Sequence, residues 1–170
     1  MPEPEGHDLQ VQIKAVSVNP VDCKIFKNVN PEKGKQKILG WDAAGVVSAV
    51  GESVSNYSVG DNVYFAGDLT RSGCNAEFQC VDERIVGKMP ASLSFSEAAA
   101  LPLTAITAWE LLFDRLELKK TSGPNEDVIL VTGAAGGVGS ILIQLAKCLT
   151  AAKVVGTASR EESQTWVKSM

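Results

Sequence analysis

The chain has 170 residues, of which 45% are hydrophobic, and its formal net charge at pH 7 is -4. This size and composition suffice for one substantial hydrophobic core or two small ones. The sequence has no basic patch of the kind that binds nucleic acid and no apolar stretch long enough to cross a bilayer. Its first ten residues lack the basic and apolar regions of a signal peptide. From these features together we expect a cytoplasmic protein with neither a nucleic-acid nor a membrane partner.

The cysteines are scattered along the chain and form no C-x-x-C pair. We therefore expect reduced, mostly buried thiols and no disulfide framework, with Cys23 among the buried ones. His7 is the only histidine. A structural zinc needs four closely grouped Cys or His ligands, so we expect no metal site.

Short β-strands are predicted in the first half of the chain. Apolar and polar residues alternate in residues 9–16 and 76–81, which is typical of half-buried strands. Residues 43–51 form a run of small and β-branched residues, and a Gly-Asp turn precedes an apolar stretch within residues 58–65. Such strands, separated by Gly and Asp, predict a small β-barrel or sandwich.

The pattern becomes helical after this region. Residues 94–96 offer hydroxyl caps, and Glu97 lies in the first turn that follows them. Pro102 divides the Ala- and Leu-rich stretch, which predicts two helical pieces, the second over residues 104–116. The polar residues 119–127 with a central Gly-Pro predict a loop.

A strand, a glycine turn, a helix and a second strand come next. Residues 128–133 begin with a continuous apolar run, of the kind that a parallel sheet buries on both faces. A helix of about a dozen residues leads to a second strand in residues 153–159, which completes one βαβ unit. The turn reads Ala134-x-Gly136-x-x-Gly139, the dinucleotide fingerprint with its first glycine replaced by alanine.

This glycine turn predicts an anion site. Glycine permits a positive φ and leaves no Cβ in the way, and the free N–H groups of a helix start attract a pyrophosphate. A role of the glycines in helix–sheet packing alone remains open. A phosphate-loop NTPase and a serine hydrolase are disfavoured, because no Gly-Lys-Ser/Thr follows and Ser140 comes after the glycines. The residues expected to bind the cofactor here are Ala134, Ala135, Gly136, Gly137, Val138 and Gly139.

The residues after the second strand indicate which dinucleotide binds. NAD-binding proteins place an acidic residue there, which accepts hydrogen bonds from the ribose 2′-OH. Ser159 and Arg160 instead suit a 2′-phosphate, so we expect NADPH. An ordinary solvated loop remains possible, and Glu161 and Glu162 keep NADH open.

Taken together, these segments resemble the medium-chain dehydrogenase/reductase superfamily, in its zinc-free quinone-oxidoreductase-like branch, and most of all a bacterial group called zinc-type alcohol dehydrogenase-like. The resemblance implies an α/β plus β fold, in which a partial GroES-like β-barrel precedes the first βαβ unit of a Rossmann domain. The implied domains are residues 1–93, without the first strands of the barrel, a connecting region at 94–124, and a partial NADP-binding domain at 125–170. The motifs that carry it are "KAVSVNPVDCKI", "LGWDAAGVVSAVG", "VGDNVYF", "EAAALPLTAITAWELL", "VILVTGAAGGVGSILIQLAK" and "TASREES".

Zinc-dependent members of this superfamily carry catalytic ligands that are missing here. Asn19, Trp41 and Leu103 stand at the three positions, and an indole N–H cannot bind a metal. The cysteine-rich lobe that holds a structural zinc is also absent from the sequence. We expect Trp41 to be either a wall of the substrate pocket or a core residue.

The resemblance implies NADPH-dependent hydride transfer to a quinone or an α,β-unsaturated carbonyl, a reaction that needs no Lewis acid. Asn19 would supply an amide to the acceptor or the cofactor, and Asp22 would fix that loop or relay a proton. Thr107 would contact the nicotinamide, and Tyr64 is a candidate phenolic donor. Asp22 could also merely cap the following helix. A full-length relative is expected to be a homodimer.

The chain has roughly half the length expected of this family. It lacks the family's first strands and ends soon after the second strand of the βαβ unit, so we expect a product truncated at both ends. A catalytically silent fragment that binds a dinucleotide or a partner weakly is therefore the alternative to the reductase. A protein that only senses NADPH is a third possibility.

Overall fold

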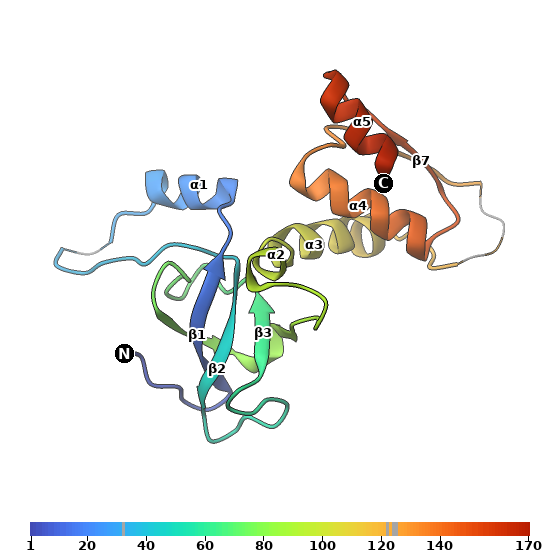
Figure 1. Cartoon of the computed structure of the whole chain (residues 1–170). Coiled ribbons are helices and arrows are strands. Elements are labelled where there is room, and N and C mark those ends of the chain that lie inside the picture. Colours follow the sequence, from blue (N-terminus) through green and yellow to red (C-terminus); the bar gives the residue numbers. More distant parts are fainter. Residues whose placement is uncertain (32, 122, 124–125) are drawn as a thin grey trace. The chain divides into compact units, whose positions relative to one another are not determined.

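The computed structural model describes residues 1–31, 33–121, 123 and 126–170. Two compact units make up the chain, Met1–Leu103 and Thr104–Met170 (Figure 1). The predicted loop at 119–127 includes positions 122, 124 and 125, which lie outside the described residues. Within the described ranges, no helix has the length and apolar character that a membrane span requires.

The first unit is built on a five-stranded antiparallel sheet, as the predicted partial barrel requires. Each strand predicted in this half is present, and one short strand of three residues was missed. In spatial order the strands are β4 (Phe78–Asp82), β1 (Asp8–Val16), β2 (Ala43–Val50), β3 (Asn62–Phe65) and β5 (Val86–Lys88).

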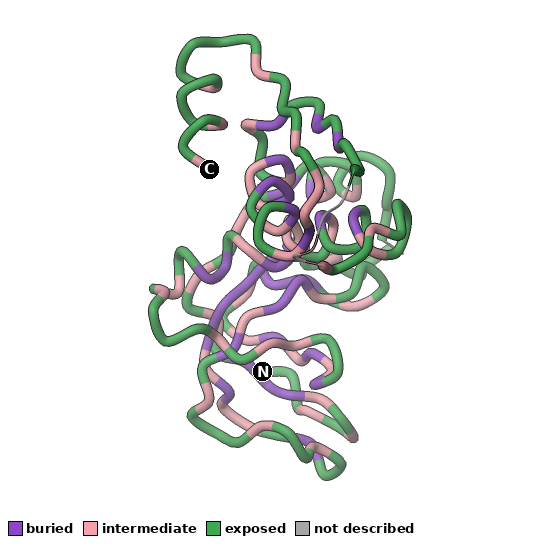
Figure 2. The backbone as a smooth tube through the Cα atoms, turned by 90° about the vertical axis from the view of Figure 1, so that its right-hand side faces the viewer, coloured by how far each residue is buried: buried purple, intermediate pink, exposed green. Residues whose placement is uncertain are grey.

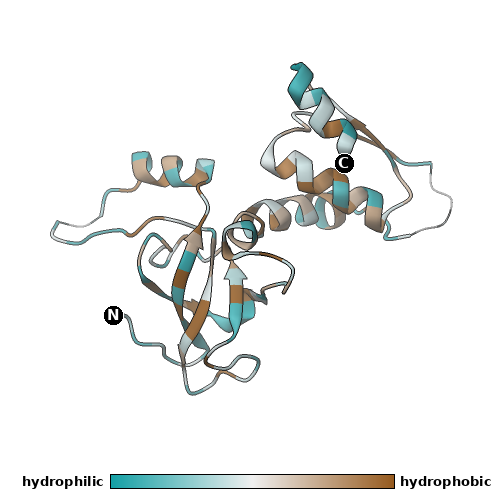
Figure 3. Ribbon diagram, in the orientation of Figure 1, coloured by the Kyte–Doolittle hydropathy of each residue, from teal (hydrophilic) through white to brown (hydrophobic). Residues whose placement is uncertain are grey.

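One face of this sheet carries the main hydrophobic core of the first unit. Leu9 and Val11 of β1 pack with Val47, Val63 and Phe65, and all five are buried. Buried stretches of the chain are purple in Figure 2. Hydrophobic and hydrophilic residues alternate along β1 (Figure 3). Because successive side chains of a strand point to opposite faces of the sheet, the hydrophobic residues of β1 share one face and the hydrophilic residues share the other. Full burial of a side chain of this size contributes roughly 1.5–3 kcal/mol.

The short helix α2 (Phe95–Ala99) packs against part of the opposite face of the sheet. Ala98 and Ala99 of this helix pack on Ala44 of β2. The predicted cap is present, because the Ser94 Oγ accepts from the Glu97 N–H at 3.3 Å and the Glu97 carboxylate accepts from the Ser94 N–H at 2.8 Å. This reciprocal arrangement satisfies backbone donors at the helix start.

In the described residues that come after α2, three α-helices, a π-helical turn and two strands follow. The helix α3 (Pro102–Trp109) begins two residues earlier than predicted, with Pro102 at its start, and continues as a π-helical turn at Glu110–Arg115. Parallel pairing of β6 and β7 with α4 between them confirms the predicted βαβ unit. The elements are β6 (Val128–Val131), α4 (Gly137–Leu149), β7 (Lys153–Gly156) and α5 (Glu161–Ser169).

The prediction that the apolar strand at 128–131 is buried on both faces is wrong in this structure. Ile129 and Val131 are buried against Leu142 and other residues of α4. Val128 and Leu130 on the other face are each 63% exposed. The reason is that α4 packs against one face of this two-stranded sheet, so its continuous apolar run is covered on one side only.

The prediction that Cys23 is buried is also wrong. Cys23 on the helix α1 (Pro20–Asn28) and Cys148 on α4 are exposed, Cys80 is half-buried and Cys74 is buried. All four are free thiols. Cys23 lies on the outer side of a helix whose buried residue is Asp22.

Candidate dinucleotide site

The turn between β6 and α4 is closed by backbone hydrogen bonds. Gly133 has a φ of +63°, which favours glycine, and its carbonyl accepts from the Gly136 N–H at 2.9 Å. The Ala134 N–H donates to the Thr157 carbonyl at 3.1 Å, and the Gly133 N–H donates to the Thr157 hydroxyl at 3.2 Å. These bonds hold the turn beside the end of β7.

The helix α4 begins with amides that have no acceptor inside the helix. The Ser140 N–H donates to the Gly136 carbonyl at 2.8 Å, which is the first hydrogen bond of the α4 ladder. The N–H groups of Gly137, Val138 and Gly139 precede it. Together with the helix dipole they place partial positive charge at this end of α4, as an anion site requires.

The two glycines of the fingerprint have different surroundings. A Cβ on Gly139 would lie 2.6 Å from the Ala134 carbonyl oxygen, and both residues are buried. A Cβ on Gly136 would meet only the Gly133 oxygen, at 3.2 Å. Gly139 therefore allows the helix to approach the strand, whereas Gly136 leaves the exposed side of the turn open.

A hollow of about 760 Å³ lies beside the turn. It brings the glycine turn together with the residues that follow β7, which are about two dozen positions away in the sequence. Its lining consists of Gly133, Ala135, Gly136, Thr157, Ala158, Ser159, Arg160 and Ser163.

The residues of this hollow fit a dinucleotide. A side chain at Gly133 would meet no atom within 4 Å, so backbone is exposed at the turn. Exposed Arg160 is the N-cap of α5, where a cation and the helix dipole act together on an anion. The hydroxyls of Ser159 and Ser163 complete a polar edge.

Four of the predicted cofactor-binding residues line this hollow, namely Ala135, Gly136, Ser159 and Arg160. Ala134 and Gly139 are buried and do not line it. Gly137 and Val138 in the first turn of α4 and the half-buried Thr107 of α3 do not line it either.

Thr157 and Ser163 line the hollow although the sequence analysis did not select them. Thr157 could have been found, because it directly follows β7 at the carboxyl end of the parallel strands.

In the first unit, Asn19 connects two buried carboxylates. Its main-chain N–H donates to Asp22 Oδ2 at 2.6 Å, so Asp22 caps α1 as the alternative interpretation held. Its side-chain Nδ2 donates to Asp42 Oδ2 at 3.0 Å. Asp22 Oδ1 is buried without a hydrogen-bond partner among the described residues.

Asp42 is the most buried acidic residue of this cluster, with 0% exposure. Burial raises its pKa to about 6, although hydrogen bonds from Asn19 and from the Leu103 main chain lower the pKa. The nearby charge of Asp22 raises it further. The bond from the Leu103 N–H to Asp42 Oδ1 is 3.0 Å long.

Tyr64 and Trp41, the remaining residues of the first unit that the sequence analysis discussed, are both at least half-buried. Tyr64 lies half-buried on β3, in the cluster with Ala98 and Ala99 of α2. Trp41 is a core residue, 2% exposed, and its indole N–H donates to the Asp68 carbonyl at 3.1 Å. In the ranges that the structure describes, no three His, Cys, Asp or Glu side chains are grouped to hold a metal ion.

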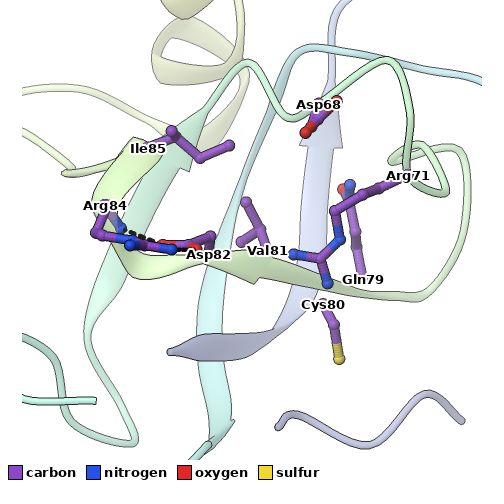
Figure 4. A pocket seen from close by; sticks show the side chains of 8 residues that line it. All are labelled: Asp68, Arg71, Gln79, Cys80, Val81, Asp82, Arg84 and Ile85. Carbon is purple, nitrogen blue, oxygen red and sulfur yellow. Dashed lines mark hydrogen bonds and ion pairs between the residues drawn. The ribbon is translucent and has the colours of Figure 1, made fainter. Parts of the chain in front are cut away.

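A second hollow, of about 300 Å³, lies in the first unit and is drawn in Figure 4. Its two arginines are already paired. Arg84 binds Asp82 at 2.8 and 2.5 Å, and Arg71 binds Asp8 at 2.8 and 2.6 Å. Because both charges are neutralised by neighbours, this hollow has no cation free to attract an anionic ligand.

Comparison with known proteins agrees with this architecture. Residues 5–104 match the alcohol dehydrogenase GroES-like domain. A zinc-type alcohol dehydrogenase-like protein of Staphylococcus epidermidis is 41% identical over 171 aligned positions, which cover 100% of this chain and 50% of that protein. The chain thus spans about half the length of the curated relatives it matches.

Solved structures show the same similarity. A putative zinc-dependent alcohol dehydrogenase from Rhizobium etli superposes with a TM-score of 0.92 at 54% identity, over 99% of this chain and 49% of that one. Escherichia coli quinone oxidoreductase, solved with NADPH, superposes with a TM-score of 0.81 at 32% identity, again over 99% and 49%. The chain belongs to the family of the alcohol dehydrogenase GroES-like domain, within the medium-chain dehydrogenase/reductase superfamily, and is similar to zinc-type alcohol dehydrogenase-like proteins and quinone oxidoreductases.

Proposed function

We propose that this protein acts in an NADPH-dependent oxidoreductase that uses no zinc and reduces a quinone or an α,β-unsaturated carbonyl. The observation that carries the proposal is the hollow in which the exposed backbone at Gly133 and Gly136 lies beside Ser159 and Arg160. The E. coli quinone oxidoreductase solved with NADPH supports the choice of cofactor.

Each part of the site has a role in this proposal. The N–H groups of Gly137, Val138 and Gly139 bind the pyrophosphate. Arg160 and Ser159 bind the 2′-phosphate, since a guanidinium forms strong charge-assisted hydrogen bonds with phosphate oxygens. NADPH, when bound, supplies a hydride to the electrophilic carbon of the acceptor, and water supplies the balancing proton.

The first unit contributes the acceptor side of the proposal. Asn19 offers its side-chain amide, Asp22 holds the turn that carries it, and Tyr64 is the candidate phenolic donor. We also propose that Thr107 contacts the nicotinamide. Such groups act by holding the acceptor in near-attack geometry.

A second candidate is a module that binds the dinucleotide without turnover. The observation that favours it is the burial of Asn19, which is 8% exposed and whose amide is already bonded to Asp42. An amide used internally in this way offers less to a substrate. Turnover assays with quinones and enones distinguish the two candidates.

The test is calorimetric titration of the purified chain with NADPH and with NADH. Replacing Arg160→Ala should weaken NADPH binding by roughly 10- to 100-fold, as expected for a lost hydrogen bond to a charged group, and change NADH binding by less than about twofold. Lys168→Ala is the matched control, because it removes an exposed cation from the last turn of the same helix. Equal weakening of both dinucleotides by Arg160→Ala would contradict the 2′-phosphate assignment.

A further inference from the structure

The helix α1 and the segment that follows it carry most of the lysines of the first unit. Residues 23–38 contain five lysines and a single acidic residue, Glu32, although the net charge of the whole chain is -4. The helix and this segment lie at the same end of the first unit (Figure 1). The average composition of the chain therefore does not reveal a local excess of positive charge.

Three of these lysines, Lys24, Lys27 and Lys33, are exposed. In the parts of the chain that the structure describes, none of their ammonium groups has a hydrogen-bond or ion-pair partner. Lys37 differs from them, because its ammonium group donates to main-chain carbonyls at 2.9 and 2.7 Å. The charges of Lys24, Lys27 and Lys33 are therefore available to an external anion.

Apolar side chains are exposed beside these charges. Phe26 is 74% exposed, and Val18, which precedes the N-cap of α1, is 81% exposed. The exposed side of α1 thus combines Phe26 with Lys24 and Lys27, whereas Asp22 is packed inward. A helix that presents both an aromatic residue and lysines to solvent is typical of helices that lie in the interface of a bilayer.

We propose that this α1 face, made of Val18, Lys24, Phe26, Lys27 and Lys33, binds an anionic lipid surface. The lysines attract the negative headgroups, and each lysine near such a surface strengthens binding by roughly fivefold. Phe26 enters the boundary between headgroups and acyl chains, where an apolar layer lies directly behind the charged one. This order of layers favours a lipid surface over an acidic protein as the partner.

The proposal departs from the expectation that the chain has no membrane partner. That expectation depended on the overall charge and on the absence of a spanning segment, and neither describes binding at the surface of a bilayer. Asn19, which we propose for the acceptor side of the reaction, is the N-cap of α1. A chain bound through the α1 face would therefore meet acceptors that dissolve in lipid, such as quinones with long alkyl tails. Only this use of the surface rests on the proposed function, and the lipid binding itself does not.

The test is co-sedimentation of the full chain with vesicles, in the absence of dinucleotide and acceptor. Vesicles of phosphatidylcholine with about 30% phosphatidylserine should bind the chain at least about tenfold more tightly than vesicles of phosphatidylcholine alone. Salt at about 0.5 M should weaken this binding, because it screens the charges of Lys24, Lys27 and Lys33.

A double charge reversal tests the lysines. Lys24→Glu combined with Lys27→Glu should weaken binding to the anionic vesicles at least about 25-fold, since two favourable charges are lost. Lys153→Glu combined with Lys168→Glu is the matched control, because it changes the net charge equally at two exposed positions outside α1. Binding of the control should change by less than about threefold, since its substitutions lie away from the α1 face.

A second variant tests the apolar contact. Phe26→Ser should weaken binding about tenfold, because the ring no longer leaves water. Val59→Ser is its control, since Val59 is a 64% exposed apolar residue of the same unit that lies outside the α1 face. Circular dichroism and urea unfolding show whether each variant is folded, as the exposure of the replaced side chains leads us to expect.

The proposal is overturned if anionic vesicles bind no more of the chain than neutral vesicles do, or if either α1 variant binds as its control does. It is also overturned if polyglutamate binds the chain and the vesicles do not, which would assign the α1 face to an acidic protein. No dinucleotide binding or turnover is measured, so failure of the proposed enzymatic function leaves this outcome unaffected.

Discussion

Gly139 and Gly136 belong to one fingerprint, yet substitution by alanine should affect different properties. In Gly139→Ala the new Cβ would lie 2.6 Å from the Ala134 oxygen and 2.8 Å from the Ala134 carbonyl carbon. Ordinary contact begins near 3.4 Å, so α4 must move away from the turn by roughly 0.8 Å. The Ala134 N–H donates to the Thr157 carbonyl at 3.1 Å, so a shift of the turn in place of the helix would break or lengthen this bond.

This displacement of α4, forced by the added methyl group, loosens the contacts between α4 and β6. Overpacking of this kind costs about 1–3 kcal/mol, and the better helix propensity of alanine returns at most about 1 kcal/mol. We therefore expect Gly139→Ala to lower the free energy of unfolding by about 1–2 kcal/mol. In Gly136→Ala the nearest atom is 3.2 Å away and the backbone, with φ of -73°, accepts alanine. Its unfolding free energy should change by less than about 1 kcal/mol.

Dinucleotide binding should show the opposite ranking. Gly136 lines the hollow, so the Cβ of Gly136→Ala would occupy space beside the turn that the pyrophosphate needs. We therefore expect NADPH affinity to fall at least about tenfold with little change in the free energy of unfolding. Hydrogen exchange of the α4 amides and urea unfolding followed by circular dichroism measure stability, and calorimetry measures binding. The reasoning is refuted if Gly139→Ala is as stable as Gly136→Ala, or if Gly136→Ala binds NADPH as tightly as the unmodified chain.

Three further substitutions test the first unit by urea unfolding. Asp42 has a pKa of about 6 against 3.8 for an ordinary Asp, so its contribution to stability is largest in acid and is lost as the pH rises through 6. Between pH 4 and pH 8 the free energy of unfolding of the unmodified chain should therefore fall by about 2 kcal/mol more than that of Asp42→Asn. Parallel curves of unfolding free energy against pH for the two proteins would exclude the raised pKa. Ser94→Ala should cost about 1 kcal/mol through loss of the α2 cap, whereas Ser96→Ala on the same helix should cost almost nothing; equal effects would rule out the capping role. Gly45→Ala would place a Cβ 2.3 Å from the Gln12 carbonyl oxygen, so β1 and β2 should separate and the variant should lack a cooperative unfolding transition; native-like unfolding would show that the strands adjust.

Much of the fold could be predicted because the hydrophobic periodicities of strands and of helices are both clear in the sequence. The alternation in β1 and the small, β-branched residues of β2 led to strands that the structure contains. The glycine turn followed by an apolar helix led to the parallel βαβ unit. The strand β5 was missed because three residues are too few to show a period of two.

The site was harder to predict where it depends on contacts between distant residues. Ser163 lines the hollow because α5 turns back beside the glycine turn, and no local pattern marks such a return. The bonds from Asn19 and Leu103 to Asp42 join positions 23 and 61 residues away, so the raised pKa could not be read from its neighbours in the sequence. The exposure of Leu130 has the same origin, because an apolar residue does not specify whether another element covers it.

The indole of Trp166 on α5 donates to the hydroxyl of Ser140 at 2.9 Å. Ser140 is the residue at which the α4 ladder begins, one position after the last free amide, and the indole remains 53% exposed. The fluorescent side chain of Trp166 is therefore hydrogen-bonded to the first turn of α4, next to the N–H groups that an anion at the turn would contact. We therefore expect the fluorescence of Trp166 to change when an anion binds at the turn, and we expect this change to be lost in Ser140→Ala.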